Sequence, residues 1–483
     1  MSVAVAARPR ERLTPRERLE VLCDPGSLQF LRTGVRSRRM ADRARDGDGV
    51  LAASGRIDGR AVAVFAQDAT FAGGSLGEQH ANTVVELLRL AERARIPVIG
   101  CMESAGARMQ EGLAALGGYG RIFRGHVALS GRVPQISIVC GASAGGGSYA
   151  PALTDFVVMT EQSSMFLTGP GVVAKVTGEE VDAAGLGGPR VHDRNGVCQM
   201  VAPSDLDALL LTRELLDYLP QRAGERPADW PTVAAPGRSP ELTVPSEERK
   251  VYDVRDVVRA VVDGGRLLEL SPRYARNVVC AFARIEGRSI GVVANQPRHL
   301  GGVLDADASQ KAARFVRTCN MFGLPLLVLV DTPGFLPGAK QEREGVIRHG
   351  AKLVHAFAEC VVPRITVVLR KGFGGAVIAM NSKQLGADFV FAWPQAQLGV
   401  MGAAQTVEII NRREIAAAAN PARERDALAA TYAREHLHPD AAAAEGFVDQ
   451  IIEPRDTRAC VAGALATLDA TAWREPTAGN IPL

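Results

Sequence analysis

The sequence lacks paired cysteines and long apolar runs. Its eight cysteines are scattered singly, and the absence of any C-x-x-C pair excludes a zinc ribbon. No uncharged apolar run reaches ~18 residues, so we expect no membrane-spanning helix. The stretch from Arg8 to Arg18 is basic and polar, without the apolar centre of a signal peptide. Together these absences predict a cytoplasmic protein whose free thiols lie in its core.

The sequence also lacks a strong charge imbalance. Its 56 basic and 53 acidic residues give a net charge of +3, too small to indicate a nucleic-acid or membrane-surface partner. No G-x-x-x-x-G-K-[ST] loop is present, so we expect no nucleotide phosphate to be bound in that way. With 483 residues, of which 47% are apolar, the chain can form two domains of roughly 200 residues each.

What the sequence does contain is an internal repeat. Short motifs of the first half recur in the second half at a nearly constant offset, with small shifts in the later part of each copy. The matching segments are 55–60 with 283–288, 73–76 with 301–304, 96–98 with 324–326, 103–106 with 331–334, 145–146 with 374–375, and 155–157 with 388–390. Several landmarks at one offset indicate two related domains in tandem.

Six prolines between residues 220 and 245 separate the two copies and predict an extended linker. We place the domains at residues 1–240 and 241–483. Apolar runs predict strands at 60–67, 98–101 and 136–140, and again at 289–295, 326–330 and 365–369. Helical spacing predicts helices near 84–94 and 308–319. Apolar strands separated by helices predict α/β domains with mostly parallel sheets.

A glycine-rich turn follows the last strand in each copy and is predicted to open a helix. The turns contain Gly145-Gly146 and Gly374-Gly375. The first N–H groups of a helix have no internal partner, and glycine lets a ligand approach them closely. Such a pair can stabilise a developing oxyanion. Tight strand–helix packing is the alternative explanation of these glycines.

Two rival motifs occur at the same places. The segment from Gly141 to Gly145 matches the G-x-S-x-G nucleophile elbow of serine hydrolases, with Ser143 as nucleophile. The second copy has Gly372 where Ser143 stands, which argues against this interpretation. The segment from Asp331 to Gly334 has the D-x-x-G spacing of nucleotide switches, but the phosphate loop that such a switch needs is missing.

The longer motifs resemble the carboxyltransferase (β) subunits of acyl-CoA carboxylases, of the propionyl-CoA carboxylase type. The resemblance runs from about Arg12 to Leu483. It is carried by residues 13–18, 73–78, 106–112, 148–156, 294–297, 311–319, 333–338 and 479–483.

That resemblance implies two tandem crotonase-like (ClpP-type) domains, the first for acyl-CoA and the second for carboxybiotin. It implies a homo-hexamer, a trimer of dimers, whose sites form between the first domain of one subunit and the second domain of another. The reaction would move a carboxyl group from carboxybiotin to the α-carbon of an acyl-CoA, with two oxyanions to stabilise. No Met-Lys-Met biotin-attachment motif is present, so an α subunit with biotin carboxylase and biotin carrier is the expected partner. No bound metal is expected.

The resemblance also assigns site residues. The two oxyanion-binding pairs would be the backbone groups of Gly145 with Gly146 and of Gly375 with Ala376. The acyl-CoA side would include Gly74, Gly106, Ala107, Tyr149 and Ile378, and the biotin side Gly334, Phe335 and Gly374. Core packing is the alternative role for Tyr149 and for Ile378.

Three departures from the family bear on function. The segment before Leu13 is short, which could weaken contact with an α subunit. Ala105 adds a methyl group within a tight glycine turn. Ile378 stands where propionyl-type members usually carry Asp, which predicts a relaxed or shifted acyl preference. A decarboxylase subunit and a non-catalytic scaffold remain as alternative functions.

Overall fold

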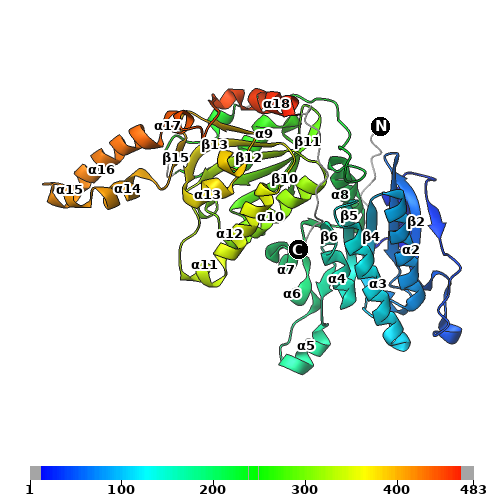
Figure 1. Ribbon diagram of the computed structural model, residues 1–483. Coiled ribbons are helices and arrows are strands. Elements are labelled where there is room, and N and C mark those ends of the chain that lie inside the picture. The colour runs from blue at the N-terminus through cyan, green and yellow to red at the C-terminus, as the bar shows by residue number, and fades with distance from the viewer. Residues whose placement is uncertain (1–11, 238, 248–249, 469–483) are drawn as a thin grey trace. The chain divides into compact units, whose positions relative to one another are not determined.

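The computed structural model describes residues 12–237, 239–247 and 250–468 (Figure 1). It consists of two compact units, one ending at Glu225 and the other beginning at Arg226. The proline-rich segment forms no helix or strand between residues 219 and 237, as the sequence predicts, but Pro240–Leu242 near its end forms a 3-10 helix. The motif at 479–483 lies outside the described residues. None of the described helices is long and apolar enough to cross a membrane.

The first unit is built on an eight-stranded sheet with the order β1-β2-β3-β4-β5-β6-β8, and β7 pairs with β5. The first three strands are antiparallel and the others pair in parallel. The strands are β1 (Gln29–Leu31), β2 (Val50–Ile57), β3 (Arg60–Gln67), β4 (Val98–Ser104), β5 (Gln135–Ala144), β6 (Phe156–Thr160), β7 (Ser164–Phe166) and β8 (Met200–Ala202). The α-helices are α1 (Pro15–Leu22), α2 (Glu78–Ala94), α3 (Leu113–Leu129), α4 (Gly146–Ala152), α5 (Pro170–Thr177), α6 (Ala183–Gly187), α7 (Pro189–Asn195) and α8 (Asp205–Tyr218).

The second unit repeats this topology. Its sheet has the order β9-β10-β11-β12-β13-β14-β16, and β15 pairs with β13. The strands are β9 (Leu267–Leu270), β10 (Val278–Ile285), β11 (Arg288–Asn295), β12 (Leu326–Thr332), β13 (Arg364–Phe373), β14 (Phe389–Ala392), β15 (Gln397–Gly399) and β16 (Gln450–Ile451). The α-helices are α9 (Val254–Val261), α10 (Ala306–Met321), α11 (Ala339–Arg343), α12 (Val346–Ala358), α13 (Gly374–Ala379), α14 (Ala403–Ile410), α15 (Arg412–Ala417), α16 (Pro421–Tyr432), α17 (Pro439–Ala444) and α18 (Thr457–Leu468).

The predicted duplication is confirmed strand by strand. β2, β3 and β4 have the same lengths as β10, β11 and β12 and precede them by one constant offset. β5 likewise matches β13 in length, at an offset that is greater by a single position. Both sheets are mostly parallel, as the uniformly apolar strands predict. The strands that precede the glycine turns run further than predicted, to Ala144 and Phe373, because their last residues pair with β7 and β15.

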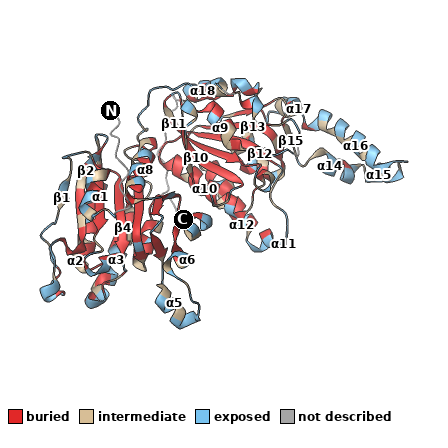
Figure 2. Cartoon of the chain, turned by 180° about the vertical axis from the view of Figure 1, so that it is seen from behind, coloured by how far each residue is buried: buried red, intermediate tan, exposed pale blue. Residues whose placement is uncertain are grey.

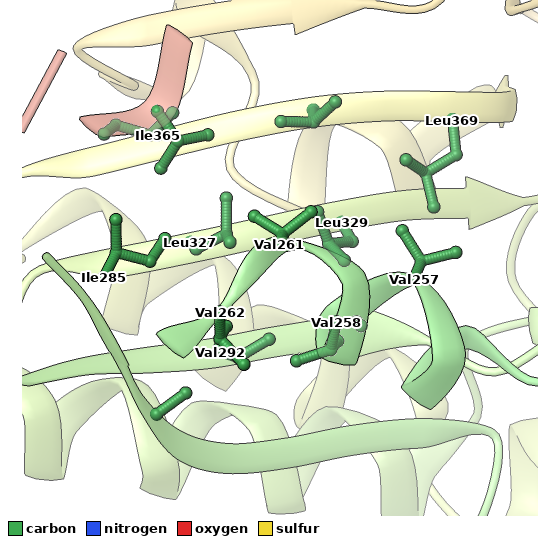
Figure 3. Packing of buried hydrophobic residues seen from close by; sticks show 14 of the residues in the cluster. Val257, Val258, Val261, Val262, Ile285, Val292, Leu327, Leu329, Ile365 and Leu369 are labelled. Carbon is green, nitrogen blue, oxygen red and sulfur yellow. The ribbon is translucent and has the colours of Figure 1, made fainter. Parts of the chain in front are cut away.

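Each sheet is covered by amphipathic helices. Four valines of α9, at positions 254, 257, 258 and 261, lie on one helical face and are fully buried. Figure 3 shows Val257, Val258 and Val261 packed over Leu327 and Leu329 of β12. Figure 2 shows the strands of both sheets as mainly buried, whereas α5, α11 and the α14–α16 arm are largely exposed. Seven of the eight cysteines are buried as free thiols.

A buried histidine gives the first unit a pH-dependent stability. Gln67 accepts the backbone N–H of Glu103 through Oε1, so its Nε2 group faces His80 Nε2, which therefore acts as acceptor. Burial lowers the pKa of His80 to about 3. The unfolded chain binds a proton at this position below about pH 6.5, whereas the folded chain does so only near pH 3. Stability should therefore fall as the pH drops from 6.5 towards 3.

Because only the unfolded chain takes up this proton, we expect His80 alone to lower the free energy of unfolding by about 2 kcal/mol when the pH falls from 7 to 5. The apparent Tm of the wild type should accordingly fall further over this range than that of His80→Asn. His126 is also buried, and burial lowers its pKa as well, but it is common to both proteins and its effect cancels in the comparison. Equal losses of Tm in the two proteins would show that His80 does not titrate as expected.

Candidate active site

Each glycine turn contains a glycine with a similar, positive φ angle. Gly145 follows β5 with φ of 57°, and Gly374 follows β13 with φ of 64°. Side chains rarely adopt this left-handed region, so each strand can turn sharply into its helix only because glycine stands there. α4 then begins at Gly146, and α13 begins at Gly374 itself.

The backbone donors at the turns differ in their availability. The N–H of Gly145, one of the predicted donors, donates to the Phe166 carbonyl at 3.0 Å and is therefore engaged. Gly146 is the first residue of α4, so its N–H has no acceptor within the helix. Gly375 and Ala376 lie in the first turn of α13, so their N–H groups also have no acceptor within the helix. The role of these groups as oxyanion donors stays a prediction.

A tyrosine from α3 fixes the first turn. The ring of Tyr119 packs so closely on Gly146 that a Cβ atom built there would lie 2.6 Å from it. The Tyr119 hydroxyl lies 3.3 Å from the Ser104 hydroxyl, which accepts the N–H of Gly106 at 3.2 Å. Burial raises the pKa of Tyr119, so its hydroxyl stays protonated at neutral pH. One side chain thus connects the glycine turn with the end of β4.

A short backbone bridge lies beside the turn in each copy. Leu76 donates to the Gly106 carbonyl at 2.8 Å and accepts from the Arg108 N–H at 2.9 Å, and so pairs in parallel with Ala107. A Cβ atom at Gly74 would lie 2.1 Å from the Glu103 carbonyl oxygen, so only glycine fits there. The bridge therefore brings the predicted residues Gly74, Gly106 and Ala107 together.

The second copy repeats this bridge with Leu304. Its N–H donates to the Gly334 carbonyl at 3.0 Å, its carbonyl accepts from Leu336 at 2.7 Å, and it pairs with Phe335. The Phe335 ring lies 3.9 Å from the position that a Cβ atom of Gly375 would occupy. The predicted biotin-side residues are thus neighbours in the structure.

Exposed apolar side chains surround both turns. Tyr149 is 52% exposed and Ile378 is 48% exposed, so neither packs in a core. Sequence reasoning missed two further residues. Leu167 is 57% exposed and Val400 is 82% exposed, and their carbonyl oxygens lie 3.8 Å and 3.2 Å from Cβ atoms built on Gly145 and Gly374. The offset between Leu167 and Val400 equals the offset between the segments 155–157 and 388–390. This match in the sequence could have identified the two residues as equivalent members of the repeat.

Ser143 does not have the surroundings of a nucleophile. Its side chain is fully buried, and its hydroxyl donates to the Gly147 carbonyl at 2.8 Å. A nucleophile elbow needs an exposed hydroxyl beside a base. The geometry does not fit the hydrolase interpretation. Among the described residues, no group of three or more His, Cys, Asp or Glu side chains could hold a metal ion.

Comparison with known proteins identifies the family. The model of the carboxyl transferase domain matches residues 6–479. The chain belongs to the carboxyl transferase family. It is 45% identical over 481 residues to a putative propionyl-CoA carboxylase β chain of Bacillus subtilis, covering 99% of this chain and 95% of that protein. It is 44% identical over 485 residues to the methylmalonyl-CoA decarboxylase α subunit of Veillonella parvula, covering 98% and 93%.

A solved carboxyl transferase structure shares the fold. A crystal structure of transcarboxylase 12S, described as a hexamer assembly with methylmalonyl-coenzyme A and methylmalonic acid bound, has a TM-score of 0.94 to this chain. The two chains are 45% identical, and the match covers 98% of this chain and 92% of that one. The predicted crotonase-like fold and the predicted propionyl-CoA carboxylase type are confirmed. This is a biotin-dependent enzyme family whose biotin is carried by another subunit.

Proposed function

We propose that this chain transfers a carboxyl group to the α-carbon of a short-chain acyl-CoA, namely acetyl-, propionyl- or butyryl-CoA, giving a malonyl-type CoA. Carboxybiotin, delivered by a separate carrier protein, supplies the carboxyl group. The observation that carries the proposal is the pair of equivalent glycine turns, each opening a helix beside a backbone bridge. A reaction with two oxyanions requires two such sets of donors.

In the first copy, we assign the thioester oxygen to the backbone N–H groups around Gly145 and Gly146. Because the N–H of Gly145 donates to Phe166, either that bond opens when substrate binds or Gly146 acts with the next N–H along α4, that of Gly147. Negative charge that develops on the thioester oxygen is stabilised by these donors and by the start of the helix. Tyr149 and Leu167, both exposed beside the turn, would form the apolar wall for the acyl chain.

In the second copy, Gly375 and Ala376 would bind the ureido oxygen of biotin. The surroundings fit such a ring, because among the described residues outside α13 a Cβ atom at Gly375 would meet only the Phe335 ring within 4 Å. The turn can therefore be approached closely, and Phe335 offers an apolar face next to the donors. We accordingly assign residues 1–240 to acyl-CoA and residues 241–483 to carboxybiotin.

The partners follow from the same proposal. We infer a homo-hexamer, a trimer of dimers, that works in the cytosol with an α subunit carrying biotin carboxylase and biotin carrier. The eight free thiols suit a reducing compartment.

Reconstitution tests the function directly. The chain would be combined with a biotinylated carrier, biotin carboxylase, ATP, bicarbonate and each acyl-CoA in turn. We expect a carboxylated CoA product with at least one short chain. No product with any thioester, including one bound to an acyl carrier protein, would favour a scaffold instead.

A decarboxylase subunit is the second candidate, because the Veillonella relative carries that name at 44% identity. The same donors would then act on a malonyl-type thioester. Incubation of the chain with a malonyl-type CoA and free biotin distinguishes the two directions. Transfer from the thioester to biotin that is faster than the forward reaction would favour the decarboxylase.

Ile378 should set the acyl preference, because its side chain is exposed on α13 and, in the proposed hexamer, the second domain of one subunit completes the acyl-CoA site of another. One methylene in an apolar pocket discriminates by about 1–3 kcal/mol, so we expect kcat/KM to change by no more than about 200-fold for each methylene between acetyl-, propionyl- and butyryl-CoA. Ile378→Asp should sharpen the preference for propionyl-CoA, whereas Ile378→Leu, the matched apolar control, should not. Strict propionyl selectivity in the wild type would contradict this expectation.

A further inference from the structure

In the first copy, the acidic residue Glu103 lies at an irregularity in the pairing of β4 with β5. Met102 of β4 pairs with Val139 of β5, but Ser104, only two positions later, pairs with Ser143. Three residues of β5 therefore stand opposite the single residue Glu103. Such bulges redirect a strand and are frequent beside active sites. Here the bulge immediately precedes the first glycine turn.

The second copy contains the same irregularity at the equivalent residue. Val330 of β12 pairs with Val368 of β13, and Thr332 pairs with Gly372. Asp331, the counterpart of Glu103 in the repeat, is the residue left opposite three residues of β13. Two bulges of the same size around two carboxylates indicate a shared feature of both copies.

In the second copy, the cation that pairs with the buried carboxylate of Asp331 comes from strand β13 itself. Arg370 Nε donates to Asp331 Oδ2 at 3.1 Å, and the Tyr252 hydroxyl donates to the same oxygen at 2.9 Å. The backbone N–H of Lys371 donates to Oδ1 at 3.2 Å. Asp331 is fully buried and Arg370 nearly so. The carboxylate thus ties the end of β12 to the residues that lead into Gly374.

In the first copy, the residue equivalent to Arg370 is Gly141, and the guanidinium comes from elsewhere. A Cβ atom at Gly141 would meet the guanidinium of Arg12, a residue that precedes α1. Arg12 donates to Glu103 Oε1 at 2.5 Å and to the Cys140 carbonyl at 3.2 Å. Arg18 Nη1 donates to the other oxygen of Glu103 at 3.1 Å.

We propose that Glu103 and Asp331 are positioning residues. Each holds the bulge from which a glycine turn emerges, Asp331 together with Arg370 and Glu103 together with Arg12 and Arg18. Arg12 supplies to the first copy the guanidinium that Arg370 supplies to the second. The effect on turnover rests on the proposed function, whereas the effect on the turn itself does not. Arg12 is half-exposed, so its removal should loosen the first turn without unfolding the chain.

Amide hydrogen exchange of the full-length chain tests the structural part. In Arg12→Ala, amides of residues 141–147 should exchange about fivefold faster, and those of 370–376 should not change. The triple variant R12A/E103D/G141R rebuilds the second copy's arrangement in the first and should return exchange to the wild-type rate. Arg16→Ala is the matched control, because Arg16 is an exposed residue of the same segment. Among the described residues, its only ion pair is with the exposed Glu20, at 3.5 Å.

Kinetics in the reconstituted enzyme test the positioning role. Misplaced donors should lower kcat of Arg12→Ala by roughly 10-fold to 100-fold with KM for acyl-CoA nearly unchanged. Arg12→Lys should recover part of kcat, and the triple variant most of it. Unchanged exchange at 141–147 in Arg12→Ala would overturn the proposal. Faster exchange without recovery in the triple variant would refute the equivalence of Arg12 and Arg370. If the wild type transfers no carboxyl group, the proposed function fails, but the exchange result still decides the role of Arg12.

Discussion

Gly146→Ala should lower kcat for carboxyl transfer by about 10²–10³-fold, the loss expected when one oxyanion donor is removed. The added methyl group would lie 2.6 Å from the Tyr119 ring, which is buried and cannot move aside easily. The start of α4 must then shift, and its first N–H moves away from the thioester oxygen. Steady-state kinetics of the reconstituted enzyme would measure the change.

Gly120→Ala is the matched control for this substitution. Gly120 is an exposed residue of the neighbouring helix α3, and a Cβ atom there would meet no described residue outside that helix within 4 Å. Alanine in a helix interior is favoured over glycine by about 1 kcal/mol, so this variant should be fully active and slightly more stable. Full activity of Gly146→Ala together with a normal Tm would show that the first glycine turn does not stabilise the thioester oxyanion.

Arg108→Ala should destabilise the first unit by about 3–5 kcal/mol, because it leaves two buried carboxylates without their cation. Arg108 contacts Asp48 and Glu111, and all three side chains are fully buried. Burial already raises the pKa of Asp48 despite the guanidinium. At about 2–4 °C per kcal/mol, the apparent Tm should drop by roughly 6–20 °C.

The pH dependence of this loss identifies its cause. A buried carboxylate without a cation has a raised pKa, so the deficit of Arg108→Ala relative to the wild type should shrink as acid protonates Asp48 and Glu111. Arg89→Ala, which breaks the exposed pair with Glu86, should change stability by no more than about 0.5 kcal/mol. A deficit that is equal at pH 5 and pH 8 would point to lost packing instead of unpaired charge.

The fold could be predicted from the sequence because its signals are local. Apolar runs such as 60–67 and 326–330 mark buried strands, and the constant offset between motifs reveals the second copy. The glycine turns could be predicted for the same reason, since a strand that bends into a helix through φ near 60° needs glycine.

The parts that could not be predicted depend on contacts between distant residues. Arg12 meets Glu103 across 91 positions, and nothing near either residue indicates the pair. Tyr119 has the spacing of an ordinary core residue of a helix, so its contact with Gly146 becomes visible only in three dimensions. The engagement of the Gly145 N–H likewise depends on Phe166, which β7 places beside β5.

Because seven of the eight cysteines are buried, the folded chain offers one thiol, that of Cys460, for chemical labelling. Burial raises the pKa of Cys23 and Cys198 to about 12 and also raises the pKa of Cys460, so the thiols differ mainly in their access to reagents. Cys460 on α18 is the one cysteine that is not fully buried. A maleimide-linked dye would therefore mark the native chain at a single helix, far in sequence from both glycine turns, and subunit assembly could be followed by fluorescence without replacing any cysteine.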